Sequence, residues 1–338
     1  MRTPSDGRRQ MKTVVRRIGS GLAALLVAAL LTPGVAAQGT VTVVTTTEDL
    51  ASLTREIGGE AVSVEAIARP YQDPHFVEPK PSYILRLVKA DLLILVGRDL
   101  EAAWLPPLLQ QSRNARIQPG SRGYLDASLT AQILDVPTGP VTRAMGDVHA
   151  LGNPHYWLDP GNGRRVARAI MSTLATLQPS RAAYVSQRYA DFDRRLAEAE
   201  RRWDAMMAPY RGTKVVTYHR SWSNFAQRFG LDVVGYVEPR PGIPPSASHT
   251  RDLVQEMRRQ NVRLIIVEPY FDLRTPNAIA RDAGARVLEL SPSVGGKGAD
   301  SYIPFFDATL RLLIDAVRQT NSLPHHPEHH DEHAAGHR

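Results

Sequence analysis

The 338-residue sequence contains no cysteine. This absence excludes disulfide scaffolds, thiolate nucleophiles, cysteine-ligated zinc or iron–sulfur sites, and lipid anchors attached through cysteine. What is present is ordinary for a soluble globular protein: 43% of the residues are hydrophobic and 22% are charged. The length predicts one large domain or two medium ones.

The formal net charge of +7 arises mainly from the first 37 residues. Basic residues between Arg8 and Arg17 precede an eleven-residue apolar run, Gly21–Leu31, and the small residues Val35-Ala36-Ala37 follow, which is the pattern of a cleavable signal peptide. Cleavage after Ala37 removes six of 41 basic and one of 34 acidic residues, leaving 35 against 33 and a net charge of +2. We therefore expect a periplasmic protein, and the argument for a nucleic-acid partner disappears.

Along the rest of the chain, apolar β-branched runs alternate with helical patterns, which predicts parallel sheets with helices on both faces. Strands are expected at 41–46, 62–67, 91–96, 214–219, 232–237, 264–269 and 286–290. Helices are expected at 48–57, 82–89, 100–111, 222–229, 248–260, 275–283 and 301–319. Between Pro179 and Pro209, apolar residues recur on one face of a single charged helix that is long enough to join two lobes.

These patterns divide the chain into five parts. They are a signal peptide (1–37), an N-terminal α/β lobe (38–178), a long connecting helix (179–209), a C-terminal α/β lobe (210–320) and a disordered His-rich tail (321–338). Ligands of such folds bind beyond the carboxyl ends of the strands, so we expect the binding site in the cleft between the lobes.

Histidines are the most informative polar residues. Six of the eleven lie between residues 325 and 337 in the tail. In the folded part, His75 and His155 each follow a proline in a loop, and His219 ends a predicted strand. Neutral imidazole is a common zinc ligand, and loops from distant segments can converge on one ion, so these three residues are candidate ligands. His149, in the loop before His155, is expected to be a solvated loop residue, and the alternative is a mobile accessory ligand.

Five segments together resemble the zinc and manganese solute-binding proteins of ABC importers, the TroA-like family. They are YQDPHFVEPKPS, KADLLILVGRDLEAAWL, GNPHYWLDP, VVTYHRSWSNFAQRFGL and PGIPPSASHTRDLVQEMRRQNVRLIIVEP. The resemblance runs from about residue 41 to 319 and implies two Rossmann-like α/β lobes joined by one long rigid helix, with a metal buried between them. It also implies metal ligation by His75, His155 and His219 and delivery to an ABC transporter membrane permease. We expect a monomer.

The fourth ligand departs from the family pattern. The family usually supplies an aspartate in a turn resembling LDPLG, but here the turn reads LSPSVGG, and the neutral hydroxyl of Ser291 is a poor zinc ligand. We predict Glu268, which follows a buried strand beside the one that ends at His219, because a carboxylate offsets the charge of the ion. Asp300 and water are the alternatives. Glu78 and Asp159 are candidates for holding the imidazole tautomers, although turn formation explains each nearly as well.

Three imidazoles favour zinc, whereas manganese sites usually carry more carboxylate oxygen. The predicted function is therefore capture of periplasmic zinc for an ABC importer. The alternatives are a receptor for manganese or another metal, an adhesin of the same fold, and a zinc-dependent hydrolase. The hydrolase is disfavoured because the sequence contains neither HExxH nor GxSxG, and we predict that the protein is not an enzyme.

Overall fold

The computed structural model describes residues 39–139, 149–240, 242–296 and 299–320. The predicted signal peptide and the His-rich tail lie outside these ranges. The described residues from Thr40 onward belong to one compact unit. No helix within the described ranges is both long and apolar enough to cross a membrane.

The first sheet has four parallel strands in the order β2-β1-β3-β4. The strands are β1 (Val41–Thr45), β2 (Val62–Ala66), β3 (Leu92–Leu95) and β4 (Tyr124–Asp126). The helices of this part are α2 (Glu48–Gly58), α3 (Pro81–Lys89) and α4 (Leu105–Ser112). Val43 packs in one apolar cluster with α2, and Val44 packs in another with α3 and α4, so helices cover both faces of the sheet.

The second sheet repeats this arrangement in the order β6-β5-β7-β8, again with parallel strands only. The strands are β5 (Lys214–Thr217), β6 (Asp232–Tyr236), β7 (Leu264–Val267) and β8 (Arg286–Glu289). The helices are α7 (Ser223–Phe229), α8 (Ala247–Arg259) and α9 (Arg274–Ala283). In both sheets the first strand in the chain lies between the second and the third, which creates the switch point where such folds bind ligands.

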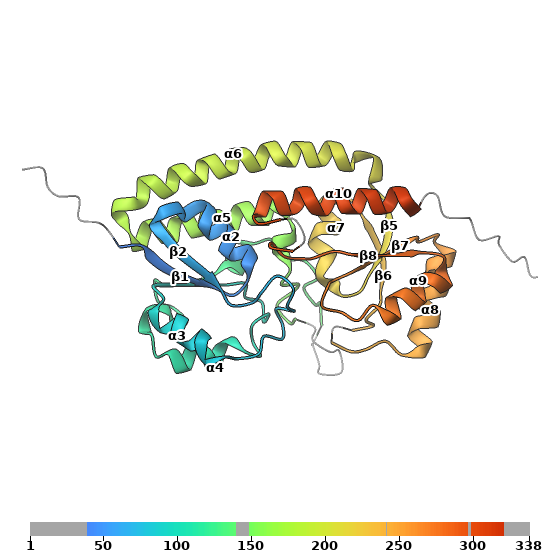
Figure 1. The fold of residues 1–338 in the computed structure, drawn as a ribbon, viewed down its shortest axis with the longest axis horizontal. Coiled ribbons are helices and arrows are strands. Elements are labelled where there is room, and N and C mark those ends of the chain that lie inside the picture. Colours follow the sequence, from blue (N-terminus) through green and yellow to red (C-terminus); the bar gives the residue numbers. More distant parts are fainter. Residues whose placement is uncertain (1–38, 140–148, 241, 297–298, 321–338) are drawn as a thin grey trace, which may run out of the picture. The chain divides into compact units, whose positions relative to one another are not determined.

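Three long helices complete the fold, two between β4 and β5 in the chain and one after β8. They are α5 (Pro160–Leu177), α6 (Ala182–Met207) and α10 (Tyr302–Thr320). α6 continues into a 3-10 turn at each end, and its buried residues lie on one face, in the same apolar cluster as residues of β1 and β5. Figure 1 shows α6 passing α2 and then α10, both of which it contacts. The prediction of two parallel α/β lobes linked by one long helix is confirmed.

Some local elements differ from the prediction. The helix expected at 100–111 begins only at Leu105, because residues 98–104 form turns around Glu101, whose carboxylate accepts hydrogen bonds from Val96 N and Gly97 N. Strand β4 and helix α5 were not predicted. α5 did carry a signal in the sequence, since Asp159 caps its N-terminus and Pro160 occupies its first position.

Candidate metal centre

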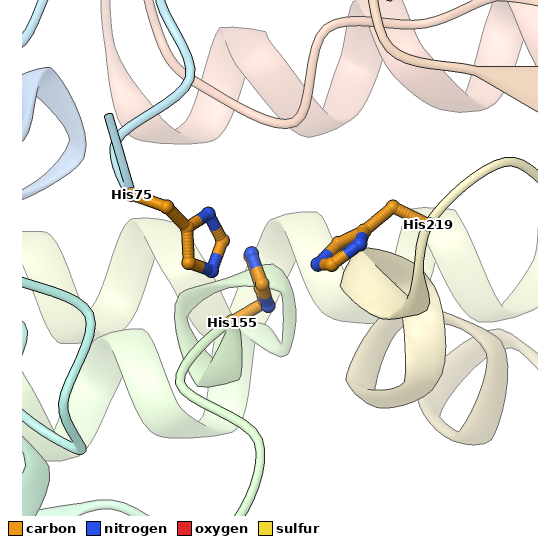
Figure 2. A group of neighbouring side chains, drawn as sticks. All are labelled: His75, His155 and His219. Carbon is orange, nitrogen blue, oxygen red and sulfur yellow. The ribbon is translucent and has the colours of Figure 1, made fainter. Parts of the chain in front are cut away.

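Three histidines from distant segments lie side by side (Figure 2). His75 lies in the loop between β2 and α3, His155 comes just before α5, and His219 follows β5. Their ligating nitrogens lie within 4.8 Å of one another, and their ring centroids are 5.1, 5.4 and 5.5 Å apart. All three are buried. The structure thus brings together the three histidines that the sequence singles out.

The loops that carry His75 and His155 have the same local structure. In each, a side-chain oxygen two residues earlier, on Asp73 or Asn153, accepts a hydrogen bond from the histidine backbone N–H at 2.9 Å. The same oxygen lies 2.7 Å from Nδ1 of His75 and 2.9 Å from Nδ1 of His155, respectively. The proline between the two residues restricts the backbone further, so each imidazole is fixed before an ion binds.

His219 is held from the neighbouring strand. Its Nδ1 lies 2.8 Å from Oε2 of Glu238, which follows β6 and is buried. An ionised carboxylate only accepts hydrogen bonds, so Nδ1 carries the proton and Nε2 keeps a lone pair. The same argument applies to His75 beside Asp73. Asn153 uses its Nδ2 as a donor to other groups, so its Oδ1 is the acceptor for His155. All three Nε2 atoms therefore offer a lone pair to a metal.

The surroundings favour neutral imidazole at the centre of the group. Burial holds the pKa of His155 well below its usual range, and the neighbouring histidines lower it further. His155 Nε2 is buried and has no hydrogen-bond partner among the described residues. Burial raises the pKa of Asp73, but the hydrogen bonds from His75 and the electrostatic interactions with His75 and His219 together outweigh burial, and the net shift is downward. A metal ion would satisfy the unpaired nitrogen of His155.

His149 lies against this group and is not simply solvated, so the sequence-based expectation for it was wrong. Its Nε2 is 3.1 Å from His75 Nε2, and the two rings stack with centroids 5.2 Å apart. Burial, and then the nearby histidines, lower the pKa of His149 to about 3, which keeps it neutral. His149 also lines a cavity of about 530 Å³ that reaches His155 and His219.

Glu268 follows β7, which pairs with β5, the strand before His219, and this pairing joins Thr217 to Ile266. Glu268 is fully buried, and its Oε1 accepts a hydrogen bond of 2.6 Å from Ser221 Oγ. Its Oε2 has no partner in the described part of the chain. Burial raises the pKa of Glu268 to about 8. The ligand atoms that lie within 4.8 Å of one another belong to the three histidines and include no oxygen of Glu268. The role of Glu268 as a ligand therefore stays a prediction.

The remaining candidates have other positions. Asp300 and Glu78 are exposed, Asp159 caps α5, and Ser291 Oγ donates to the Ser293 carbonyl. The suggestion that Glu78 and Asp159 hold the imidazole tautomers was wrong, because Asp159 forms a turn and the tautomers are held by three other residues.

Those three residues, Asp73, Asn153 and Glu238, were missed in the sequence. For the first two a signal existed, since an Asp or Asn stands two residues before each candidate histidine, with a proline between them. Glu238 is 19 residues from His219, and only the pairing of β5 with β6 brings the two together.

Comparison with known proteins places this geometry in a family context. Residues 43–316 match the family model of ZnuA, the periplasmic component A of the zinc-uptake complex. The chain is 25% identical over 308 residues to the high-affinity zinc uptake system protein ZnuA of Yersinia pestis, covering 87% of this chain and 97% of that protein. It is 23% identical over 288 residues to the manganese ABC transporter substrate-binding lipoprotein PsaA of Streptococcus pneumoniae, covering 82% and 89%. A solved structure of a 138–173 ZnuA deletion mutant with zinc bound has a TM-score of 0.69 and 24% identity, covering 86% of this chain and 100% of that one.

Proposed function

Because the chain belongs to the zinc-uptake component A family, we propose that it is a solute-binding protein that captures zinc and delivers it to the permease of an ABC importer. This family consists of solute-binding proteins rather than enzymes. The observation that carries the proposal is the convergence of His75, His155 and His219. We propose these three residues as the metal ligands, each through Nε2.

Zinc is favoured over manganese by the chemistry of the donors. The converging group consists of neutral imidazole nitrogens, which suit zinc, whereas manganese prefers carboxylate, carbonyl and water oxygens. Since one relative is a manganese transporter component by name, the identity of the metal is the point to test.

The test begins with protein stripped of metal by a chelator and then offered equal amounts of zinc and manganese. We expect elemental analysis to find one tightly bound zinc per chain and little manganese. Alanine variants of His75, His155 and His219 should each lose the tight ion. His249→Ala is the matched control, because His249 Nε2 contacts the Tyr236 carbonyl and does not belong to the group. A preference for manganese, or tight zinc binding by His155→Ala, would contradict the proposal.

For the fourth coordination position we propose two candidates, Glu268 from the sequence argument and His149 from its 3.1 Å contact with His75. Glu268→Gln and His149→Gln separate them, with the exposed Asp300→Asn as control. Weaker zinc binding in only one of the first two variants assigns that residue. Unchanged binding in both leaves water as the fourth ligand, and a loss in Asp300→Asn would assign the loop instead.

We also propose that the protein acts in the periplasm as a monomer, after cleavage behind Ala37. The lack of cysteine argues against the lipid anchor that the name of the PsaA relative denotes. The separate sheets support lobes at 38–178 and 210–320, joined by the helix at 179–209 and followed by the tail from 321. Light scattering of the purified protein tests the monomer, and a dimer mass would contradict it.

A further inference from the structure

Two of the three groups that hold the histidines are carboxylates. Asp73 Oδ1 lies 2.7 Å from His75 Nδ1, and Glu238 Oε2 lies 2.8 Å from His219 Nδ1. The side chains of these carboxylates are only 19% and 8% exposed. His155, by contrast, is held by the neutral amide of Asn153. Two negative charges therefore lie one imidazole ring away from the place where the Nε2 atoms converge.

We propose that Asp73 and Glu238 are positioning residues that also balance the charge of the bound ion. Their two negative charges match the two positive charges of zinc, so the site does not need a carboxylate in direct contact with the metal. This inference rests on the proposed function, since it takes His75, His155 and His219 as the ligands. It assigns the charge compensation to residues that act through the imidazoles.

The two carboxylates should affect metal affinity strongly even though an imidazole ring separates each of them from the ion. A carboxylate that accepts from Nδ1 makes Nε2 a stronger base and fixes the ring, and loss of such a partner typically costs 10- to 100-fold in metal affinity. Both carboxylates are mostly buried, so solvent and salt screen their interaction with the ion less than at an exposed surface.

Charge balance and simple orientation make different predictions. A Coulomb interaction scales with the charge of the ion. Removal of a carboxylate charge should therefore reduce the binding free energy of a divalent ion twice as much as that of a monovalent ion. An effect on ring orientation alone should weaken both ions equally. Ag⁺ is a suitable monovalent probe, because it also binds imidazole nitrogen.

The experiment compares Asp73→Asn, Glu238→Gln and the double variant with the wild-type full chain. Each amide keeps one oxygen that can accept from Nδ1 and removes the charge, while its NH2 group replaces the second carboxylate oxygen. We expect the zinc dissociation constant to rise about 10- to 100-fold in each single variant. In the double variant the increase should be about the product of the two single increases. The fold-increase in the Ag⁺ dissociation constant should be near the square root of the fold-increase for zinc. Glu101→Gln is the matched control. Glu101 is also buried, but it binds Thr46 Oγ1 and the backbone of Val96 and Gly97, so zinc affinity should not change.

Melting of the metal-free variants checks that the fold is intact. The inference is overturned if Asp73→Asn and Glu238→Gln bind zinc within threefold of the wild type. It is also overturned if each variant loses the same factor in affinity for Ag⁺ as for zinc, because ring orientation would then be the only role of the carboxylates. Failure of the proposed function has a different result: the alanine variants of the three histidines would then bind zinc like the wild type, whatever the amide variants do.

Discussion

Asn153 connects His155 to the segment that carries His219, so its replacement should disturb both halves of the site. Its Oδ1 accepts from the backbone N–H and from Nδ1 of His155, at 2.9 Å each. Its Nδ2 donates to Asp135 Oδ2 at 2.9 Å and to the Arg220 carbonyl at 2.8 Å. These four bonds use the full capacity of a buried amide. Asn153→Ala therefore frees the His155 ring and removes a link between the two lobes.

The size of the effect follows from the groups left without partners. A buried polar group that loses its hydrogen bond costs about 1–3 kcal/mol. With the His155 N–H and the Arg220 carbonyl both affected, we expect the free energy of unfolding to fall by about 2–6 kcal/mol. Because His155 also loses the group that orients it, zinc affinity should fall about 10- to 100-fold.

Denaturant unfolding of the metal-free protein and chelator competition for zinc measure the two effects separately. Asn162→Ala is the matched control. Asn162 is equally buried, its Oδ1 accepts from Gln132 N, and its Nδ2 donates to the carbonyls of Gln132 and Tyr156, but it holds no histidine ring. It should lose comparable stability and keep wild-type zinc affinity. Equal loss of affinity in both variants, or wild-type affinity in Asn153→Ala, would refute the reasoning.

Four further predictions test other parts of the molecule. Deletion of residues 325–338 should lower the number of weakly bound zinc ions in elemental analysis and leave one tight ion; loss of the tight ion would place the main site in the tail. Burial raises the pKa of Asp49 from 3.8 to about 7, so unfolding free energy should fall as pH rises from about 4 to 7. Urea unfolding should show that the free energy of unfolding of the wild type falls by on the order of 4 kcal/mol between pH 4.5 and pH 8, and that Asp49→Asn lacks this fall. The same dependence of stability on pH in the variant and the wild type would contradict the prediction. Leu196→Ala, in the buried face of α6, should cost about 2–5 kcal/mol of unfolding free energy without changing zinc affinity, and a cost below about 1 kcal/mol would contradict its role in the core. Cell fractionation should find the mature chain in the periplasmic extract; recovery only in the membrane pellet after high-salt washing would count against export as a soluble protein.

The parts of the fold that the sequence predicted are those that depend on local pattern. β3 and β7 are short, apolar and fully buried, so the run of residues alone identifies them. The apolar face of α6 could be predicted because its buried residues, from Val185 to Met207, follow the helical period along most of this 26-residue helix. β4 was missed because three half-buried residues are too few to show any period.

At the site, the sequence identified the histidines but not what holds them. His75, His155 and His219 stand out by residue type and position, and the structure brings them together. The pairing of β5 with β7 was also foreseen, but pairing fixes only the backbone. The direction of the Glu268 side chain depends on Ser221, whose hydroxyl binds Oε1, and no rule of strand spacing contains that contact.

The positions of Asp73 and Glu238 change the argument that first favoured a carboxylate ligand. That argument placed Glu268 in contact with the ion, but its physical reason was only that negative charge is needed nearby. Two mostly buried carboxylates on the far side of the imidazoles meet the requirement, because charge also acts across the ring. In the proposed site, the nitrogen donors then determine which metal binds, while the outer carboxylates determine how tightly a divalent ion is held. Substitutions at the histidines and at the carboxylates should therefore alter selectivity and affinity separately.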